Sequence, residues 1–545
     1  MLLLSNRAEL QAWRRNQTKP VHFVPTMGAL HQGHQQLIRR AAAPRGAGNP
    51  VVLVSVYVNP LQFGPAEDFD RYPRDLASDR LLAERAGADA LFAPSAEEMQ
   101  PGGSAAITRV LPPSCLQTSL CAPGRPGHFE GVATTVVRLL SWVRPDRLLL
   151  GEKDWQQLVI LRRVLADLGF QLSVEGCSTI REHDQLACSS RNRYLTPPQR
   201  ALAAALPSVL RSLRDQVASR SAGQMLPTFG GLAAALRSRL EAAGFVVEYA
   251  ELLEAHTLEP LESPQGISLL AAAIHCGATR LIDHVFLMSR SPIVAIDGPA
   301  GAGKSTVTRA FARQLGLVYL DTGAMYRAVT WWVQRQNVDP SDPLAVKGCL
   351  EQLDLKLQSG PDGEPRVSIQ GHDVTKEIRS PEVTAQVSVL AAHGCVREAL
   401  TQQQQSMGEH GGLVAEGRDI GTAVFPDADL KVYLTATVAE RARRRALDLE
   451  ERGFPVPAIT TLEDQIAERD QMDSTRAVAP LQKAKDAVEL VTDGLGIDLV
   501  IQQLVDLFRQ RVPEEAWPVT SLSSELKGSS DSSSPVQASS SRSKT

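Results

Sequence analysis

The chain has 545 residues, 43% of them hydrophobic, and a formal net charge of −4 at pH 7. This length predicts more than one globular domain, and the small net charge gives no indication of a nucleic-acid partner. The sequence has no apolar run of about 18 residues that would span a membrane, an N-terminal apolar run too short for a signal peptide, and seven cysteines without CxxC spacing. We therefore expect a cytoplasmic protein with reduced thiols.

Buried strands alternate with helices along the first part of the chain. Strands are predicted over residues 21–24, 51–58, 90–92, 147–150 and 172–175. Helices are predicted after the turn that follows the first strand and over residues 75–87, 131–143 and 154–168. This alternation predicts a doubly wound α/β domain in residues 1–195. A helix pair over 198–243 and strands near 245–252, 268–274 and 280–286 predict a smaller α+β subdomain in residues 196–289.

A short β-branched strand that ends in a glycine-rich turn opens the second half. Residues 293–306 read IVAIDGPAGAGKST and match the P-loop pattern G-x-x-x-x-G-K-[ST]. Glycines let backbone N–H groups surround a phosphate without a Cβ atom in the way, and the helix that follows points its positive end at the same place. Lys304 can reach the β- and γ-phosphates, and the Ser305 hydroxyl can bind Mg²⁺. The predicted ATP-binding residues of this turn are Gly298, Gly301, Gly303, Lys304, Ser305 and Thr306.

The remaining elements predict a second α/β domain in residues 292–514. Helices are predicted over 305–315, 323–336, 382–407, 438–451 and 496–511. Strands are predicted over 413–415, 430–434 and 488–491, and a polar excursion with short strands over 351–380. The serine-rich segment 519–545 lacks apolar periodicity, and we expect it to be disordered.

His31 and His34 lie where the first strand turns into a helix. Two histidines at a helix start can both face a bound phosphate, with help from the helix dipole. The same pair could instead bind a metal ion or lie on the surface, and the motif alone leaves these alternatives open.

Five motifs in this order resemble the pantoate–β-alanine ligase family, over about residues 2–285. They are PTMGALHQGHQQLIRRA, SVYVNPLQFGPAEDFDRYPRD, GRPGHFEGVATTVVRLL, GEKDWQQL and REHDQLACSSRNRYL. The resemblance implies a Rossmann-like nucleotidyltransferase fold and a reaction in two steps. The carboxylate of pantoate attacks the α-phosphate of ATP to give pantoyl adenylate, and the amine of β-alanine then displaces AMP.

The resemblance also implies roles for individual residues. His34, Lys153 and Arg191 are the catalytic candidates, because a carboxylate that attacks a polyanion needs its charge neutralised. Gln62 and Gln157 are expected to bind pantoate and β-alanine. The expected ATP-binding residues are Met27, Gly28, His31, His34, Gly151, Lys153, Asp154, Ser189, Ser190 and Arg191.

One position departs from the family pattern. Gln185 stands where a glycine is expected, so we expect an altered loop but unchanged chemistry. Taken alone, Lys153 and Asp154 could be a solvated pair at a helix start, and Gln62 an ordinary loop amide.

The second half resembles bacterial cytidylate kinase, over about residues 292–512. The motifs are LDTGAMYRAVTWW, VSVLAAHGCVREAL, EGRDIGT and RDQMDSTRAVAPL, and there is no Asn-Lys-x-Asp guanine motif. The resemblance implies transfer of the ATP γ-phosphoryl group to CMP or dCMP with Mg²⁺, and it places Arg469 at ATP. The implied CMP-binding residues are Thr322, Arg327, Ser388, Arg397, Arg418, Asp419, Asp473 and Arg476.

The basic helix at 438–451 is predicted to be a lid that excludes water, although such a run is usually a solvated face. Arg418 could instead be an ion-pair partner in the core. The whole sequence thus predicts a bifunctional enzyme that uses ATP, pantoate, β-alanine and CMP, as a homodimer through its first half. Two rival hypotheses are that the first half is only an assembly module, or that the second half is a P-loop switch or ATPase.

Overall fold

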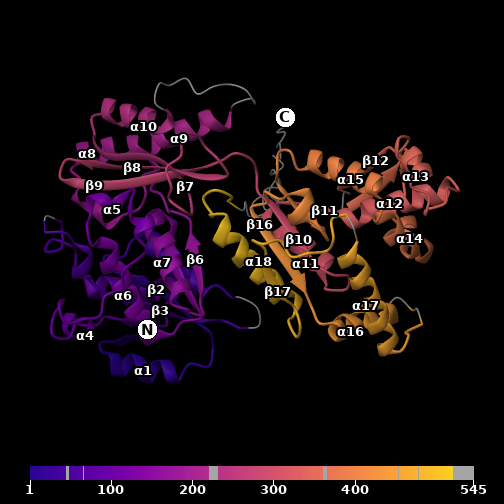
Figure 1. The fold of residues 1–545 in the computed structure, drawn as a ribbon. Helices are drawn as coiled ribbons and strands as arrows, with labels where there is room; N and C mark the ends of the chain where they lie inside the picture. Colours follow the sequence, from indigo (N-terminus) through magenta and orange to yellow (C-terminus); the bar gives the residue numbers. More distant parts are fainter. Residues whose placement is uncertain are drawn as a thin grey trace, which may run out of the picture.

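The computed structural model describes residues 1–44, 48–65, 67–219, 231–359, 365–451, 453, 455–476 and 478–518. The serine-rich segment 519–545, which we predict to be disordered, lies outside the described residues. Figure 1 shows two α/β halves side by side, the first in indigo to magenta and the second in orange to yellow, with α18 (Ile497–Arg511) between them.

The first half is built on a six-stranded parallel sheet, which confirms the predicted α/β class. In sheet order the strands are β1 (Leu2–Leu4), β4 (Ala90–Phe92), β3 (Val51–Val56), β2 (Val21–Thr26), β5 (Arg147–Gly151) and β6 (Ser173–Cys177). The helices are α1 (Arg7–Arg15), α2 (Gln32–Ala42), α3 (Leu76–Ala86), α4 (Ala96–Met99), α5 (Cys121–Gly124), α6 (His128–Val143) and α7 (Trp155–Asp167). Four short helical turns join them: η1 (Pro60–Gln62), η2 (Ser114–Gln117), η3 (Glu152–Asp154) and η4 (Ser190–Tyr194).

Both faces of this sheet are buried. Val24 and Val54 pack with α2 and α3 on one face, while Phe23 and Leu53 pack with α6 and α7 on the other. Successive side chains of a strand point to opposite faces, so a strand covered on both sides reads as a continuous apolar run. This explains why residues 51–58 could be recognised as a strand from the sequence.

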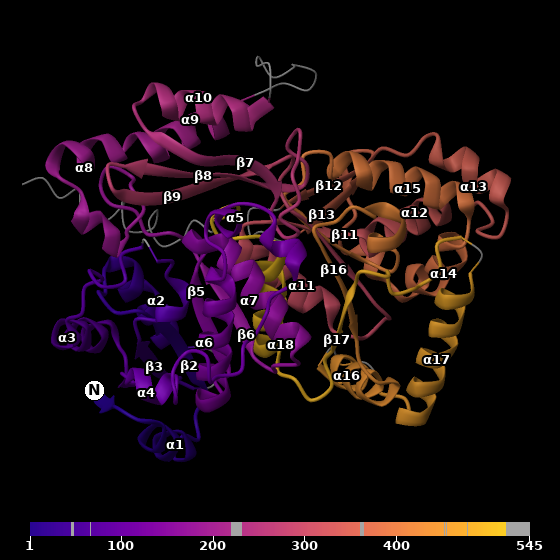
Figure 2. The same cartoon turned by 60° about the vertical axis from the view of Figure 1, so that its left-hand side comes forward.

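A three-stranded antiparallel sheet forms the smaller subdomain of the first half. It consists of β7 (Val246–Glu254), β8 (Ile267–Cys276) and β9 (Thr279–Met288). The predicted helix pair proves to be three helices, α8 (Pro197–Ala203), α9 (Ala205–Ala218) and α10 (Gly231–Ala242). Figure 2 shows α9 and α10 above this sheet.

The second half contains a five-stranded parallel sheet. In sheet order the strands are β11 (Val318–Asp321), β15 (Leu413–Gly417), β10 (Ile293–Asp297), β16 (Leu430–Thr435) and β17 (Val488–Val491). The polar excursion contains the antiparallel strands β12 (Leu355–Ser359), β13 (Pro365–Ile369) and β14 (His372–Asp373). The remaining helices are α11 (Lys304–Leu315), α12 (Thr322–Arg335), α13 (Pro343–Leu350), α14 (Pro381–Ala391), α15 (Gly394–Met407), α16 (Val438–Glu451) and α17 (Ile459–Thr475), with the short turns η5 (Glu377–Arg379) and η6 (Ile420–Val424).

The prediction of one helix over 382–407 is wrong, because the chain breaks between α14 and α15. His393 takes an extended backbone (ψ 127°), and its Nε2 lies 2.8 Å from the Pro340 carbonyl oxygen. A contact 53 residues away along the chain thus ends one helix and starts the next, and local periodicity carries no sign of it.

One apolar cluster continues from the first half into the second. It includes Val174 of β6, Phe311 of α11, and Leu504 and Phe508 of α18. Both views place α18 beside β6 and α11. The halves are therefore joined by a packed interface as well as by the short connection between β9 and β10.

None of the helices within the described ranges has the length and apolar character that a membrane crossing requires.

Candidate active sites

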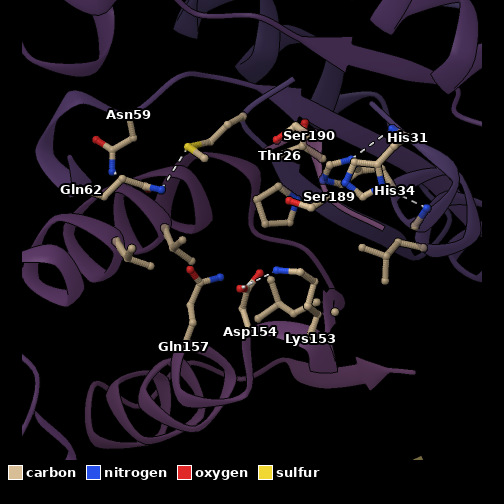
Figure 3. Close-up of a pocket in the computed structure, with 18 of the residues that line it drawn as sticks. Thr26, His31, His34, Asn59, Gln62, Lys153, Asp154, Gln157, Ser189 and Ser190 are labelled. Carbon is tan, nitrogen blue, oxygen red and sulfur yellow. Dashed lines mark hydrogen bonds and ion pairs between the residues drawn. The ribbon is translucent and has the colours of Figure 1, made fainter. Parts of the chain in front are cut away.

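The first cavity opens where β2 and β5 lie side by side at their carboxyl ends. The chain leaves β2 for β3 on one side, and β5 occupies the other side, which is the kind of position where α/β sheets bind ligands. The cavity has a volume of about 250 Å³. It brings together these residues predicted from the sequence: Met27, His31, His34, Gln62, Gly151, Lys153, Asp154, Gln157, Ser189, Ser190 and Arg191. Figure 3 labels most of them around the opening, together with Thr26 and Asn59.

The two histidines cap the start of α2. His31 Nδ1 accepts a hydrogen bond from the Gly33 N–H (3.2 Å), and His34 Nδ1 accepts one from the His31 N–H (3.4 Å). Burial, assisted by His34, lowers the pKa of His31 to about 2, and burial lowers the pKa of His34 to about 4. Both rings are therefore neutral at pH 7 with the proton on Nε2, so each offers one N–H donor to a phosphate oxygen.

Lys153 and Asp154 follow β5 directly. The Lys153 amine lies 3.5 Å from Asp154 Oδ1, and 51% of the Asp154 side chain remains exposed. Burial acts to raise the pKa of Asp154, but the charges of Lys153 and Arg191 outweigh it and hold the pKa below its usual value. A cation and a carboxylate thus both line the cavity, with the carboxylate half exposed, and their role at the nucleotide stays a prediction.

Amide side chains occupy another side of the cavity. Gln62 Nε2 donates to Met27 Sδ (3.0 Å), and Asn59 Nδ2 donates to Gln62 Oε1 (3.1 Å). The Gln62 carbonyl oxygen lies 2.7 Å from His128 Nδ1 at the start of α6. Figure 3 shows Gln157 below Gln62 on the same side of the cavity. Neutral amides that are fixed in this way can orient a small hydroxy acid without adding charge.

The loop before α3 is tied to the serine–arginine motif. Arg191 forms two hydrogen bonds with the Asp68 carboxylate (2.8 and 3.1 Å), and the Tyr72 hydroxyl lies 3.2 Å from Ser190 Oγ. Asp68 holds the Arg191 guanidinium at the cavity before any nucleotide binds.

Two positions explain backbone requirements of this site. Gly28 does not line the cavity; it has φ +79°, and a Cβ atom there would lie 2.7 Å from Asp79 Oδ2. Gln185, where we expected a glycine, adopts φ +73°. The loop therefore keeps the left-handed backbone that a glycine would favour, with a strained glutamine in its place.

Sequence reasoning missed several residues of the first cavity. Arg125 and His128 line it, and Arg125 pairs with Glu67 (2.6 Å). Both belong to the motif GRPGHFEG, so a charge and an imidazole at a predicted helix start were the available signal. Thr26, Asn59 and Tyr72 also lie in the quoted motifs, but they are uncharged, and nothing in their residue type distinguished them from their neighbours.

The second cavity, of about 1040 Å³, surrounds the P-loop. The Lys304 amine donates to the carbonyl oxygens of Gly298 and Pro299 (2.8 Å each). Burial, assisted by the positive charge of Arg418, lowers the pKa of Lys304 to about 7. Gly298 has φ +148° and does not line the cavity, and a Cβ atom there would lie 2.0 Å from the Leu434 carbonyl oxygen.

The predicted acceptor residues meet at the carboxyl ends of β11 and β15. The cavity is lined by Thr322, Arg327, Ser388, Arg397, Arg418, Asp419, Arg469, Asp473 and Arg476. Arg418 pairs with Asp473 (3.0 Å), Arg327 pairs with Asp321 (3.1 Å), and Arg397 forms an ion pair with Asp419. Arg418 thus has an ion-pair partner, as one alternative proposed, but the pair lies in the cavity and not in the core.

Arg469 lies among other cations. Burial, with help from Arg418 and Arg327, lowers its pKa, although Asp473 acts in the opposite direction. Its Nε atom is buried with no hydrogen-bond partner among the described residues. Such a concentration of positive charge is suited to a polyphosphate ligand.

The basic helix α16 packs on the P-loop. Arg441 pairs with Asp470 of α17 (2.6 Å) and donates to the Ala300 carbonyl oxygen (3.2 Å), and Arg444 donates to that of Ala302 (3.3 Å). Arg443, which is 60% exposed, pairs with Glu440. The helix therefore combines a buried and a partly buried arginine that contact the P-loop with a solvated face, and its role as a lid stays a prediction.

Three further residues complete the second cavity. Asp321, Tyr326 and Glu416 line it, and Glu416 accepts from the Ser305 hydroxyl (2.8 Å). Asp321 and Tyr326 belong to the motif LDTGAMYR and could have been chosen from it.

In the part of the chain that the structure describes, no group of three or more His, Cys, Asp or Glu side chains could hold a metal ion. The two histidines of the first cavity therefore lack further ligands of this kind.

The fold and the two cavities define a nucleotidyltransferase-like half followed by a P-loop kinase half. The family model for pantoate-beta-alanine ligase matches residues 3–286, and the model for cytidylate kinase matches residues 294–510.

The comparisons with individual proteins agree with these matches. A bifunctional pantoate ligase/cytidylate kinase from Prochlorococcus marinus (strain MIT 9313) is 61% identical over 93% of this chain and 99% of the relative. The protein of that name from Parasynechococcus marenigrum (strain WH8102) is 60% identical over 95% of this chain and 99% of the relative. Pantothenate synthetase from Thermus thermophilus is 43% identical, with a TM-score of 0.47, and the match covers 52% of this chain and 99% of that one. The chain belongs to the family of bifunctional pantoate ligase/cytidylate kinases.

Proposed function

We propose that the first half condenses pantoate with β-alanine through pantoyl adenylate, and that the second half phosphorylates CMP and dCMP. Membership of the bifunctional family supports both activities. One observation supports the ligase assignment most strongly. A single cavity holds a neutral histidine pair, a lysine, an arginine and two glutamines that lie far apart in the sequence.

In the first step of the ligase reaction, a carboxylate oxygen of pantoate forms a bond with the α-phosphorus of ATP, and pyrophosphate leaves. The Nε2–H groups of His31 and His34 donate to phosphate oxygens, and Lys153 and Arg191 neutralise the charge that develops. Ser189 and Ser190 add hydroxyl donors, and Gln62 and Gln157 hold the pantoate.

In the second step, the amine of β-alanine attacks the acyl carbon, and AMP leaves with the bonding electrons while the amine loses a proton. Asp154 accepts from the ribose hydroxyls throughout. Because both reactants are bound side by side, the protein needs no covalent intermediate of its own.

In the kinase reaction, a phosphate oxygen of CMP attacks the γ-phosphorus of ATP, the bond from that phosphorus to the β–γ bridging oxygen breaks, and ADP leaves. Lys304 leaves the carbonyl oxygens of the P-loop for the β- and γ-phosphates, and Arg469 and Arg476 contact the group in transfer. Arg327, Arg397 and Arg418 bind the phosphate of CMP, while Asp419 and Asp473, with Thr322 and Ser388, bind its sugar and base. Mg²⁺, when bound with ATP, neutralises phosphate charge, and the Ser305 hydroxyl is a suitable oxygen ligand for it.

We also infer that the chain acts in the cytoplasm as a homodimer through its first half. The two reactions share ATP but no intermediate, so we expect no channelling. A kinase rate that responds to pantoate and β-alanine at saturating ATP would contradict this expectation.

The test is chromatography of the adenine nucleotides after the purified chain is mixed with Mg-ATP, pantoate and β-alanine. AMP that forms only with both co-substrates supports the ligase. If no AMP appears, while CMP added in a separate assay still yields ADP and CDP, the first half is inactive or serves another acid, and the hypothesis of an assembly module leads. Formation of ADP without stimulation by CMP would instead favour an ATPase in the second half.

A further inference from the structure

The turn that follows α18 reaches the first cavity from outside. Residues 513–517, the C-terminal turn, read Pro-Glu-Glu-Ala-Trp, and the N–H groups of Ala516 and Trp517 both donate to the Pro513 carbonyl oxygen (3.1 Å each). The Trp517 indole donates to the Leu315 carbonyl oxygen at the end of α11 (2.9 Å). This turn therefore belongs to the kinase half and is fixed to the helix that carries the P-loop lysine.

Glu152 of the ligase half binds the backbone of this turn. Glu152 precedes Lys153 in η3 and is only 1% exposed. Its carboxylate accepts from the N–H groups of Glu514 (2.7 Å) and Glu515 (2.9 Å). A Cβ atom at Gly176 would lie 2.9 Å from Leu158 Cδ2 and 3.2 Å from Glu152 Cγ and Oε1, so the glycine in β6 makes room for both side chains. The short helix that carries Lys153 is thus anchored to the kinase half.

The side chain of Glu515 makes a second connection, to Thr179. Glu515 Oε1 accepts from the Thr179 N–H (2.9 Å) and also from the Thr179 hydroxyl. Thr179 lines the first cavity. The next residue, Ile180, accepts from the Cys188 N–H (2.9 Å), directly before the Ser189–Arg191 motif. Glu515 therefore holds one arm of a loop whose other arm leads to the serines and arginine that we place at ATP.

We propose that Glu515 is a positioning residue for the ligase reaction, so that the ligase site is complete only when the kinase half is docked. This proposal rests on the ligase function proposed above. Glu515 touches no substrate; its carboxylate acts through Thr179, and it also pairs with Arg181 at 3.6 Å. Residues that orient the ligands of a catalytic metal commonly change activity by about 10- to 100-fold when removed, and we expect an effect of similar size here.

The chain offers a matched pair of variants. Glu515→Ala and Glu514→Ala each remove one carboxylate from the same turn and leave the N–H that donates to Glu152. The Glu514 carboxylate pairs with Arg40 at the end of α2 (2.9 Å), and Arg40 does not line the cavity. Only Glu515→Ala should therefore disturb the cavity wall.

The measurement is steady-state formation of AMP by the full-length chain at varied ATP, with CMP kinase activity measured in the same samples. Glu515→Ala should lower the ligase kcat/KM for ATP about 10-fold or more. Glu514→Ala should stay within about 2-fold of the unsubstituted chain, and kinase activity should be unchanged in both. Glu515→Gln, whose amide oxygen can still accept from Thr179, should restore most of the ligase activity.

Two results would overturn the proposal. One is a Glu515→Ala chain with full ligase activity. The other is an equal loss of ligase activity in Glu514→Ala and Glu515→Ala together with an equal fall in thermal midpoint. That result would mean that the turn only stabilises the contact between the halves. The double variant Glu515→Ala/Thr179→Val tests whether Glu515 acts through Thr179. If it does, the ligase kcat/KM of the double variant should be no lower than that of Glu515→Ala alone. Absence of AMP from the unsubstituted chain would count against the ligase function itself.

Discussion

Gln185 shows how a single backbone angle links the sequence to the site. At φ +73° a residue with a Cβ atom is strained, yet the chain keeps this conformation. The Gln185 N–H donates to the Glu182 carbonyl oxygen (2.8 Å), and Arg181 donates to the Gln185 carbonyl oxygen (3.1 Å). These backbone contacts explain how the loop tolerates a side chain that the family pattern does not contain.

We predict that Gln185→Gly stabilises the chain by about 0.5–1 kcal/mol, because glycine relieves strain in the left-handed region. Urea denaturation, followed by tryptophan fluorescence, measures the change. Gln171→Gly is the matched control: Gln171 is exposed and does not have a positive φ, so glycine there should be neutral or destabilising. An equal change in the free energy of unfolding at both positions would contradict the prediction that the backbone of Gln185 is strained.

Lys153 tests the chemistry of the first cavity. Lys153→Ala should lower AMP formation by about 10²- to 10³-fold, the usual cost of removing one group that stabilises charge in a transition state. The CMP kinase activity of the same sample should be unchanged. Lys19→Ala, at an exposed loop lysine, should leave both activities intact. A ligase that survives Lys153→Ala would leave that lysine without a catalytic role.

Lys304 should take up a proton when ATP binds. The pKa of the Lys304 amine is about 7 in the free site, so at pH 7.5 most of the amine groups are neutral. The phosphates of ATP should raise this pKa, so that the amine binds a proton and becomes positively charged. Calorimetry in buffers of different ionisation enthalpy measures this uptake at the kinase site, as the difference between the unsubstituted chain and Lys304→Met. The uptake should vanish below about pH 6, where the free amine is already protonated.

At the scale of the elements, the sequence predicted the helices and strands that are determined by local sequence pattern. The P-loop, its strand and its helix were correctly placed because glycine spacing and apolar runs act locally. The strand β11 and the long helix α17 were missed, since only their C-terminal residues were noted, within the motifs LDTGAMYRAVTWW and RDQMDSTRAVAPL. The face of α16 that packs on the P-loop could not be predicted, because it depends on Asp470 of another helix.

Gly298→Ala should abolish CMP kinase activity and leave AMP formation intact. The new methyl group would lie 2.0 Å from the Leu434 carbonyl oxygen, so the P-loop must move away from β16. Gly348→Ala in α13 is the control, because a Cβ atom there meets nothing within 4 Å. Parallel assays of both activities measure the effect, and normal kinase activity in Gly298→Ala would contradict it.

At the scale of the whole molecule, the sequence predicted two α/β halves and most of both cavities, but not how the halves are joined. Arg147 of β5 pairs with Asp506 of α18 (2.6 Å), 359 residues later in the chain. Neither residue belongs to a motif. The residues of the cavities were recognisable because catalysis demands particular chemical types, whereas an interface needs only complementary surfaces.

Phe508 should be a central residue of that interface. It is fully buried, with its ring 6.1 Å from that of Phe311. Phe508→Ala should destabilise the chain by about 3–5 kcal/mol and let both activities fail together on heating. Leu499→Ala on the same helix, where the side chain is 49% exposed, should cost less than about 1 kcal/mol. Thermal inactivation curves for both activities provide the measurement, and loss of only one activity would contradict a shared core.

The contacts of Glu152 and Thr179 also bear on the order of synthesis. Their partners Glu514 and Glu515 leave the ribosome 362 and 336 residues later, respectively. A nascent chain halted before this point, or a protein clipped there by a protease, would contain every residue of the ligase motifs but lack the hydrogen bonds that hold two of its walls. Full ligase activity would then appear only when the kinase half is complete, so that unfinished chains would consume ATP and pantoate more slowly.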